Sequence, residues 1–563
     1  MKVLIVGGVA GGATAAARIR RLDENAEIIV FERSGYISYA NCGLPYYIGD
    51  VITDPEELTL QSPETFFERF RVHMKVRHEV TAIHPDEKKI SVKNLVTGEE
   101  FKESYDKLIL SPGAKPTQPR ISGAESDKIF TLRTVEDTFR IKEHIKKNNP
   151  KTAVVAGGGF IGIEIAENLR ELGLEVTIVQ RPKQLMNVFD GDMSSMIHSE
   201  MRKHGVKLAL GHTVEGFEEK DGGVEVILKD DAPICGDMVV LAIGVTPDTY
   251  LAKEAGLELG IKGSIVVNDR METSVPDIYA AGDAVQVKHY VSGADSLISL
   301  AGPANKQGRI IADNVCGGDS RYLGSQGSSV IKIFQMTGAT TGLTETNAKK
   351  AGLEVDSVVL SPMSHAGYYP GGKLMTMKVV FEKETYRLLG AQIVGYEGVD
   401  KRIDVLATAI HAGLSAIQLK NLDLAYAPPY SSAKDPVNMA GFMIENISKG
   451  TLKQWYIEDV KALQEDENVI LLDSRTAEEY ARGHIEGAYN IPVDELRERV
   501  NELDSQKKIY VNCQSGMRSY IACRILEAYG FEAYNLSGGY RFYEAVIKDR
   551  GMIESATACG MDK

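Results

Sequence analysis

The sequence predicts an α/β protein of several domains, and three observations support this prediction. Two short apolar runs, each typical of a buried strand, lead into glycine-rich turns at Gly7–Gly12 and Gly157–Gly162, and a helix-forming segment follows each turn. A further apolar run ends in polar residues at Val469–Arg475 and opens a separate C-terminal pattern. With 563 residues the chain is too long for one hydrophobic core, so about three or four domains are expected.

Composition argues against two classes of partner. The formal net charge of −14 disfavours binding to a phosphate backbone, so no nucleic-acid partner is expected. No apolar run reaches the roughly 18 residues of a membrane span. Met1 leads directly into the strand-like run Val3–Val6, which leaves no room for a signal peptide. We therefore expect a cytoplasmic protein with no membrane partner.

The six cysteines form neither a C-x-x-C pair nor a Cys/His cluster at zinc spacing, so no metal site is expected. Cys235, Cys316 and Cys523 are interpreted as small buried hydrophobes. Cys559 falls in a C-terminal tail. Two thiols, Cys42 and Cys513, remain as candidates for chemistry.

The first glycine turn is typical of a pyrophosphate site. Free backbone N–H groups and a helix N-terminus together attract the anion, and Gly7 and Gly12 mark the turn. Glu32 ends the next predicted strand, where it can accept a hydrogen bond from a ribose hydroxyl. The middle glycine of the motif is replaced by Val9, so an ordinary tight turn stays an alternative.

A second copy strengthens this interpretation. Gly157, Gly159 and Gly162 stand in full G-x-G-x-x-G register, with a helix expected to begin near Ile163. The strand that follows ends at Gln180 rather than at an acid. Two such units imply two dinucleotides, with electrons passing between them.

Two more segments, Tyr105–Ala114 and Val275–Asp283, resemble motifs of the two-dinucleotide flavoprotein disulfide reductases. This resemblance covers about residues 1–445 and implies FAD on the first glycine turn and NAD(P)H on the second. It further implies that Arg33, Gly113 and Asp283 bind cofactor, with Asp283 at the flavin ribityl chain. An acid at position 180 would have repelled the 2′-phosphate of NADPH. Its absence leaves both nucleotides possible, and NADH is favoured.

Cys42 has no cysteine partner nearby, because Tyr47 and Ile37 occupy the positions where one would stand. A single thiol must pair with a small thiol as a mixed disulfide, or with oxygen as a sulfenic acid. The segment Ser38–Cys42 is similar to the S-F-x-x-C motif of coenzyme A disulfide reductases, with Tyr39 in place of Phe.

That resemblance implies the other site residues. In the family, tyrosines matching Tyr368 and Tyr426 flank the cysteine, the second from the partner subunit, and interface packing is the alternative role. Residues 332–443 resemble the family's dimerisation domain, which implies a homodimer. The candidates for binding coenzyme A are Arg18, Arg21, Ser38, Asn41, Arg71 and Lys434. A solvated charged helix face is the alternative for Arg18 and Arg21.

The C-terminal pattern closely matches the rhodanese fold. Cys513 follows a predicted strand and opens a loop that ends at Arg518, ahead of a helix. Successive backbone N–H groups around such a sulfur stabilise a thiolate and an anionic persulfide. Four residues separate Cys513 from Arg518, one fewer than in the related phosphatase loop, which favours sulfur over phosphate. A purely binding domain is the alternative.

These observations give predicted boundaries for each part of the chain. They are an FAD-binding domain at 1–115 and 246–325, an NAD(P)H-binding domain at 116–245, a dimerisation domain at 326–445, a linker at 446–456, a rhodanese domain at 457–550 and a tail at 551–563.

Together, the motifs resemble the fusions of coenzyme A disulfide reductase with rhodanese, also described as NADH-dependent persulfide reductases. The resemblance implies that Cys42 reduces coenzyme A persulfide, polysulfide or disulfide, while Cys513 handles sulfane sulfur and Arg518 contacts its substrate. Two other functions stay open: an NADH oxidase or peroxidase with a Cys42 sulfenic acid, and a redox sensor that stores coenzyme A as a mixed disulfide.

Overall fold

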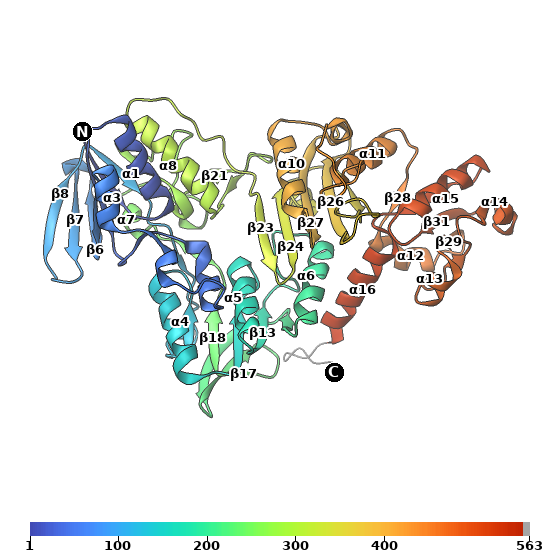
Figure 1. The fold of residues 1–563 in the computed structure, drawn as a ribbon, viewed down its shortest axis with the longest axis horizontal. Coiled ribbons are helices and arrows are strands. Elements are labelled where there is room, and N and C mark those ends of the chain that lie inside the picture. The colour runs from blue at the N-terminus through green and yellow to red at the C-terminus, as the bar shows by residue number, and fades with distance from the viewer. Residues whose placement is uncertain (556–563) are drawn as a thin grey trace. The chain divides into compact units, whose positions relative to one another are not determined.

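The computed structural model describes residues 1–555, whose contacts divide the chain into two compact units (Figure 1). The first unit contains residues 1–183 and 205–327, and the second contains 184–204 and the chain from residue 328 onward. Residues 184–204, which lie within the predicted NAD(P)H-binding domain 116–245, group by contacts with the second unit. No described helix combines the length and the apolar character that a bilayer span requires.

The first unit is built on two five-stranded parallel sheets. One has the order β20-β9-β1-β2-β5 and the other the order β11-β18-β12-β13-β14. The inner positions of their central strands are apolar and buried, as expected for parallel sheets covered on both faces, whereas the edge strand β5 carries His73 and Lys75. The bounds are β1 Lys2–Val6, β2 Glu27–Glu32, β5 His73–Val76, β9 Lys107–Leu110, β20 Ile278–Ala280, β11 Ile129–Thr131, β12 Thr152–Ala156, β13 Glu175–Gln180, β14 Lys207–Leu210 and β18 Met238–Leu241.

Helices and small antiparallel sheets complete this unit. Helices α1 and α8 lie side by side against the first sheet (Figure 1), and Gly308 allows this close approach, because a Cβ there would sit 2.4 Å from the carbonyl oxygen of Gly11. The bounds are α1 Ala10–Leu22, α2 Leu44–Ile48, α3 Pro63–Phe70, α4 Val135–Asn148, α5 Phe160–Glu171, α7 Tyr250–Glu254, α8 Ala301–Val315, β3 Ile37–Tyr39, β4 Thr59–Gln61, β6 His78–His84, β7 Lys89–Asn94, β8 Glu100–Ser104, β15 Val214–Lys220, β16 Gly223–Leu228 and β17 Ile234–Gly236.

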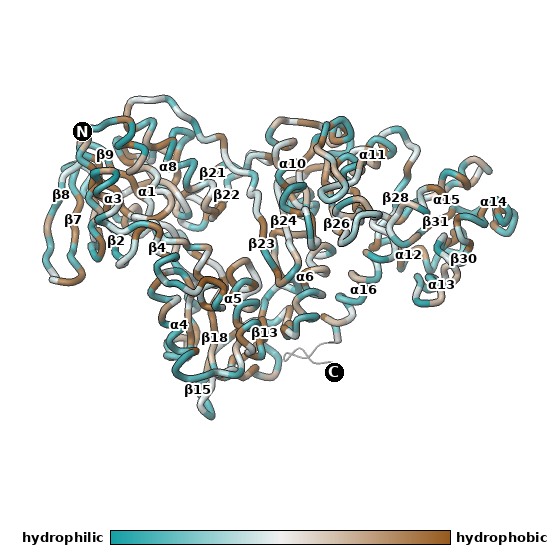
Figure 2. Tube along the Cα trace, in the orientation of Figure 1, coloured by the Kyte–Doolittle hydropathy of each residue, from teal (hydrophilic) through white to brown (hydrophobic). Residues whose placement is uncertain are grey.

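The second unit begins with an antiparallel sheet of order β23-β24-β27-β26-β25. In Figure 2 the apolar colouring follows strands such as β18 and β23, whereas the outer helix α4 is largely hydrophilic. The bounds are β23 Ser329–Ile333, β24 Met336–Gly342, β25 Val355–Leu360, β26 Met375–Glu382, β27 Leu388–Gly395, α6 Gly191–Lys203, α9 Glu345–Lys350, α10 Val399–His411 and α11 Pro436–Ser448.

A second sheet of this unit, with the order β28-β32-β31-β29-β30, is parallel. Trp455, the one tryptophan of the sequence, is buried on one face of this sheet and donates its indole N–H to the carbonyl oxygen of Val511 at 3.1 Å. The bounds are β28 Gln454–Trp455, β29 Val469–Asp473, β30 Tyr489–Asn490, β31 Lys508–Asn512, β32 Ala533–Leu536, α12 Val460–Gln464, α13 Ala477–Ala481, α14 Leu496–Arg499, α15 Met517–Ala528 and α16 Gly539–Ser555.

The predicted α/β class is confirmed, and two details differ. Helix α5 begins at Phe160, three residues before the expected Ile163, because the last glycine of the turn lies inside its first turn. Cys235 was expected to be buried, but it is exposed on the three-stranded sheet beside Glu225. Cys559 lies outside the described residues.

Candidate functional site

The first glycine turn has the geometry of an anion cradle. Gly7 has a φ of +98°, and a Cβ on it would sit 2.1 Å from the carbonyl oxygen of Ser111. A Cβ on Gly12 would sit 1.9 Å from the oxygen of Gly7, so both positions require glycine. Helix α1 begins just beyond with no acidic residue in its first turn and no side-chain cap, which leaves its N–H groups available to a phosphate.

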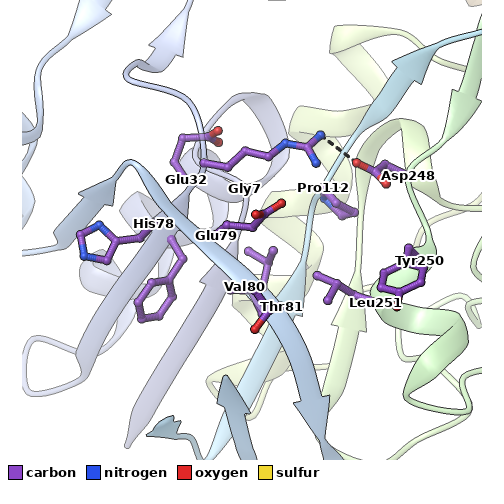
Figure 3. Close-up of a pocket in the computed structure, with 13 residues that line it drawn as sticks. Gly7, Glu32, His78, Glu79, Val80, Thr81, Pro112, Asp248, Tyr250 and Leu251 are labelled. Atoms are coloured by element: carbon purple, nitrogen blue, oxygen red, sulfur yellow. Dashed lines mark hydrogen bonds and ion pairs between the residues drawn. The ribbon is translucent and has the colours of Figure 1, made fainter. Parts of the chain in front are cut away.

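A cavity of about 270 Å³ opens beside this turn (Figure 3). Glu32 lines it and accepts the backbone N–H groups of Gly8 and Ser34, each at 2.8 Å, and its remaining lone pairs can accept ribose hydroxyls. The guanidinium of Arg33 pairs with Asp248 at 2.7 Å, the dashed contact in Figure 3. These residues therefore fit the adenosine end of FAD.

A second polar cluster lies at the ends of the neighbouring strands. Asp283 accepts a hydrogen bond from the Arg133 guanidinium at 2.7 Å, and a Cβ on Gly113 would meet that guanidinium at 3.3 Å. The Tyr39 hydroxyl donates to the carbonyl oxygen of Arg133 at 3.4 Å, which brings this cluster beside the Cys42 segment. Sequence reasoning found Gly113 and Asp283 but missed Arg133.

The second glycine turn repeats the first. Gly157 has a φ of +114°, and a Cβ on Gly162 would sit 2.0 Å from the Gly157 oxygen. A Cβ on Gly159, in contrast, would have no protein atom within 4 Å. A ligand backbone can therefore approach Gly159 closely. The Gln180 side-chain oxygen accepts the Gly158 N–H at 3.0 Å, the same contact that Glu32 makes in the first unit. A neutral amide here repels no phosphate, so the turn fits either NADH or NADPH.

Cys42 lies in the short 3-10 turn Asn41–Gly43 that runs into α2. Its side chain is exposed, and Ser38, four residues earlier, adopts a left-handed φ of +42°. The protein packed around the sulfur raises the pKa of the Cys42 thiol, the Glu164 carboxylate raises it further, and Arg133 opposes both. At neutral pH this environment favours the thiol over the thiolate.

Glu164 on α5 is a residue that the sequence did not single out. Burial raises the pKa of its carboxyl to about 7, and the Glu167 carboxylate adds to this. Burial likewise raises the pKa of Tyr46, one helical turn beyond Cys42, to about 12, with Glu164 as the second cause. Glu164 therefore titrates near neutral pH and affects the charge balance around Cys42.

The predicted coenzyme A arginines have different environments. The guanidinium of Arg18 is half-buried and paired with Asp313 at 2.9 Å, whereas Arg21 is exposed. Arg71 is also exposed and lies 5.2 Å from the ring centre of Phe67. Arg20, which sequence reasoning missed, is buried and donates to the carbonyl oxygens of Phe70 and Arg71 at 2.8 and 2.9 Å. It joins α1 to the C-terminal end of α3, so Arg21 and Arg71 lie on neighbouring elements.

In the second unit, the hydroxyls of Tyr368 and Tyr426 lie 2.8 Å apart. Both rings are exposed, and so is Lys434 on the loop that carries Tyr426. The two tyrosines are therefore paired within one chain, and the supply of the second tyrosine by the partner subunit stays a prediction.

Cys513 directly follows β31, and the residue is 1% exposed. The sulfur accepts the Gly516 N–H at 3.1 Å and the Ser519 hydroxyl at 3.2 Å. The Ser519 oxygen also lies 2.5 Å from Asn535 Oδ1, so its single hydroxyl hydrogen is shared between this oxygen and the Cys513 sulfur as alternative acceptors. The loop therefore provides hydrogen-bond donors for an anionic sulfur.

Arg518 ends the Cys513 loop but does not stand free. Its two terminal nitrogens pair with both carboxylate oxygens of Glu479 at 2.6 and 2.8 Å, and this pair lowers the pKa of Glu479 to about 2. Arg475, missed from the sequence, is buried against Asp473 and lies 3.9 Å from the ring centre of Tyr540. Both arginines near Cys513 are therefore paired with carboxylates, Arg518 with Glu479 and Arg475 with Asp473, which reduces the positive charge available to an anion at Cys513.

These features define the class of protein. The two glycine turns, the adenosine cavity and the lone thiol are those of a flavin-dependent pyridine nucleotide reductase, joined here to a second domain with a cradled cysteine. Residues 1–308 match the pyridine nucleotide-disulphide oxidoreductase model, residues 328–436 match its dimerisation domain, and residues 457–545 match the rhodanese-like domain. The chain belongs to the pyridine nucleotide-disulphide oxidoreductase family.

Three known proteins are similar over most of their length. A coenzyme A disulfide reductase of Staphylococcus aureus is 38% identical over 442 residues, which is 78% of this chain and 99% of that protein. The reduced Bacillus anthracis CoADR-RHD is 48% identical with a TM-score of 0.95, over 98% of each chain. An NAD-dependent persulfide reductase from A. fulgidus is 36% identical with a TM-score of 0.91, over 96% of this chain and all (100%) of the other. The resemblance inferred from the sequence is thereby confirmed.

Proposed function

We propose that this chain is an NADH-preferring reductase of coenzyme A persulfide, polysulfide and coenzyme A disulfide. The observation that carries the proposal is the lone exposed Cys42 thiol beside two dinucleotide cradles, in a chain that also holds Cys513 in a donor-lined loop. Bound FAD would supply two-electron transfer between the nicotinamide and a disulfide of the Cys42 sulfur. Glu32, Arg33, Gly113 and Asp283 would hold it, and Gly157, Gly159, Gly162 and Gln180 would hold NADH.

The proposed sulfur chemistry balances in two steps. The Cys42 thiolate attacks the inner, carbon-bound sulfur of coenzyme A persulfide, the S–S bond of the persulfide breaks, and the outer sulfur leaves as hydrosulfide while a Cys42–coenzyme A disulfide forms. That mixed disulfide then takes up two electrons and one proton, which restores the Cys42 thiolate and releases coenzyme A as a thiol. The raised pKa of Cys42 means that a neighbouring donor must stabilise this thiolate.

The paired tyrosines are the proposed donors. A hydroxyl of Tyr368 or Tyr426 can give a proton to the leaving sulfur, and the 2.8 Å contact between the two lets the second hydroxyl compensate the charge of the first. Arg21, Arg71 and Lys434 would bind the phosphates of coenzyme A, with Ser38 and Asn41 along its arm. Arg18 contributes less charge because Asp313 pairs with it.

Cys513 is proposed to carry sulfane sulfur for the reductase. Its sulfur accepts two hydrogen bonds, which suits an anionic persulfide. A homodimer completes the proposal. It is supported by the match to the dimerisation domain and by the exposed Tyr368, Tyr369 and Tyr430, which a partner could cover.

The decisive experiment is anaerobic NADH oxidation by the FAD-loaded protein, with coenzyme A persulfide, coenzyme A disulfide or hydrogen peroxide as acceptor. The proposal expects rapid oxidation with both sulfur substrates, and stoichiometric hydrosulfide from the persulfide alone. Fast turnover with peroxide and none with persulfide would reassign Cys42 to sulfenic-acid chemistry. No turnover with any acceptor would favour a redox sensor.

A further inference from the structure

Arg402 is fully buried, and neither the cofactor-binding residues nor the reactive cysteines explain why a cation is placed there. It lies on α10 in the second unit, and its side chain is 1% exposed. Its Nε and Nη2 atoms donate to the Asp435 carboxylate at 3.2 and 3.0 Å. Burial of a guanidinium is costly unless every donor finds a partner, so the remaining contacts show what this residue organises.

The remaining contacts of Arg402 join two loops. Its Nη2 donates to the carbonyl oxygen of Ser364 at 2.9 Å, in the loop between β25 and β26, and to the Ser431 hydroxyl oxygen at 3.2 Å, in the loop that precedes α11. It also contacts the carbonyl oxygen of Tyr430 at 3.3 Å. One planar group therefore holds the bases of both loops.

The loops are fastened to each other and to the same carboxylate. The Ala366 N–H donates to the carbonyl oxygen of Ser431 at 3.1 Å. The Ser431 hydroxyl donates to the Asp435 carboxylate at 2.7 Å, and the other oxygen of Asp435 accepts the Val437 N–H at the start of α11. Arg402, Ser431 and Asp435 thus form one buried cluster at the base of both loops.

The outer parts of these loops carry three of the proposed site residues. Tyr368 lies two residues beyond Ala366, and Tyr426 and Lys434 lie on either side of Ser431. Tyr368 is 75% exposed and Tyr426 is 46% exposed, so little protein of this chain holds either ring directly. The 2.8 Å distance between their hydroxyls therefore depends on how the two loop bases are held together.

We propose that Arg402 is a positioning residue for the sulfur reaction, which fixes Tyr368 against Tyr426 and sets Lys434 beside them. This inference rests on the proposed role of the tyrosine pair. A misplacement of about 1 Å in a catalytic group costs up to roughly a hundredfold in rate, so a loosened cluster should slow the tyrosine-dependent step without affecting steps at the nucleotide sites.

The test uses Arg402→Lys in the full-length, FAD-loaded protein. Lysine keeps the charge but lacks the fork that reaches Asp435, Ser364 and Ser431 together. Arg387→Lys, at an arginine of the same antiparallel sheet domain with a side chain 47% exposed, is the matched control. Two steps are measured in a stopped-flow instrument: flavin reduction by NADH, and reoxidation of the reduced protein by coenzyme A disulfide.

We expect Arg402→Lys to slow reoxidation by about ten- to a hundredfold and to leave flavin reduction within about twofold of wild type. In a Tyr368→Phe/Tyr426→Phe background, Arg402→Lys should slow reoxidation by less than about twofold more, because the residues it positions are already inactive. Ser431→Ala, a smaller disturbance of the same cluster, should give an intermediate loss and serves if Arg402→Lys does not fold.

The outcomes separate this inference from the proposed function. A normal reoxidation rate in the tyrosine double variant overturns the donor role of the tyrosines and the positioning role of Arg402, and leaves the reductase function standing. Failure of coenzyme A disulfide to reoxidise the reduced wild-type protein overturns the proposed function itself. A slow double variant combined with normal rates in Arg402→Lys and Ser431→Ala overturns the positioning role alone. Equal losses from Arg402→Lys in both backgrounds, or an equal loss in flavin reduction, also overturn it, because a general structural defect gives that result.

Discussion

Cys42 and Cys513 are both reactive-thiol candidates, yet they are surrounded in opposite ways. The Cys513 sulfur is buried and accepts a backbone N–H and a serine hydroxyl from its own loop. The Cys42 side chain is exposed, and the nearby protein raises the pKa of its thiol. The rhodanese-like loop can therefore stabilise an anion before any substrate arrives. Under the proposed function, Cys42 would depend on the substrate, the flavin and the paired tyrosines to stabilise its thiolate.

The strongest test of this contrast is Cys42→Ser. We expect turnover of NADH with coenzyme A disulfide to fall by at least about a thousandfold, because the hydroxyl is a poor nucleophile and forms no disulfide. Bleaching of the flavin by NADH should persist, which separates loss of the thiol from loss of the cofactor. Retained turnover would show that another group takes the electrons.

The reciprocal variant is Cys513→Ser. Sulfur transfer from a persulfide donor to cyanide should fall by at least about a hundredfold, since no other described residue offers a cradled nucleophile. Reduction of coenzyme A disulfide should stay at the wild-type rate. If that reduction also fails, the two thiols do not act independently, and their different surroundings cannot be read as separate functions.

Ser519→Ala tests whether the hydrogen bonds at Cys513 matter. A hydrogen bond to a charged group contributes about 1.5–3 kcal/mol, so sulfur transfer should slow by about ten- to a hundredfold. Ser519→Thr retains the hydroxyl and serves as the matched control. Equal rates for serine and alanine at this position would mean that the Gly516 N–H suffices.

Glu164→Gln probes the environment of Cys42. Because the folded pKa of Glu164, about 7, lies above its ordinary value of 4.5, its contribution to stability is fully present below pH 4.5 and is lost as the pH rises through 7. The wild type should therefore lose stability relative to Glu164→Gln across this range, as unfolding midpoints will report. Removing the negative charge also lowers the pKa of the Cys42 thiol, so alkylation of the reduced protein by iodoacetamide at pH 7 should accelerate by about a few-fold. An unchanged alkylation rate would place Glu164 too far from the thiol to matter.

The smallest effect is expected at the Arg518–Glu479 pair. The pKa of Glu479 is lowered to about 2, so the pair contributes stability above the ordinary value of 4.5 and loses it as the pH falls toward 2. The pair is partly exposed, and water screens it to about 1 kcal/mol or less. Glu479→Gln should therefore destabilise slightly at pH 7 and not at all near pH 2, by chemical denaturation. Equal destabilisation at both values would assign the effect to packing.

Much of the fold was predictable because its signals are local. Glycines directly after a strand predict a tight turn. At Gly7 and Gly157 the structure has positive φ values, which glycine adopts without strain because it lacks a Cβ. Cys513 and its loop were equally visible. The boundary of α5 was missed by three residues because helix starts have no sharp signal where glycine supplies the first turn.

Several of the residues that sequence reasoning missed act through distant partners. Arg20 donates to the carbonyl oxygen of Phe70, 50 positions away, and Arg133 pairs with Asp283, 150 positions away. Arg402 reaches two loops whose closeness depends on the whole antiparallel sheet. Periodicity and motif spacing carry no information on such pairings. The joint placement of Tyr368 and Tyr426 in one chain was hidden for the same reason.

Trp455 gives the second unit an intrinsic optical label. It is the one tryptophan in the sequence, it is buried, and its indole is bonded to the residue two positions before Cys513. All tryptophan fluorescence of the protein therefore originates in the parallel sheet whose strand β31 leads to Cys513, whereas the visible absorbance would come from the flavin of the first unit. Tryptophan fluorescence would report sulfur loading at Cys513 while flavin absorbance reports electron transfer to Cys42. Both signals can be followed in one sample without an attached dye.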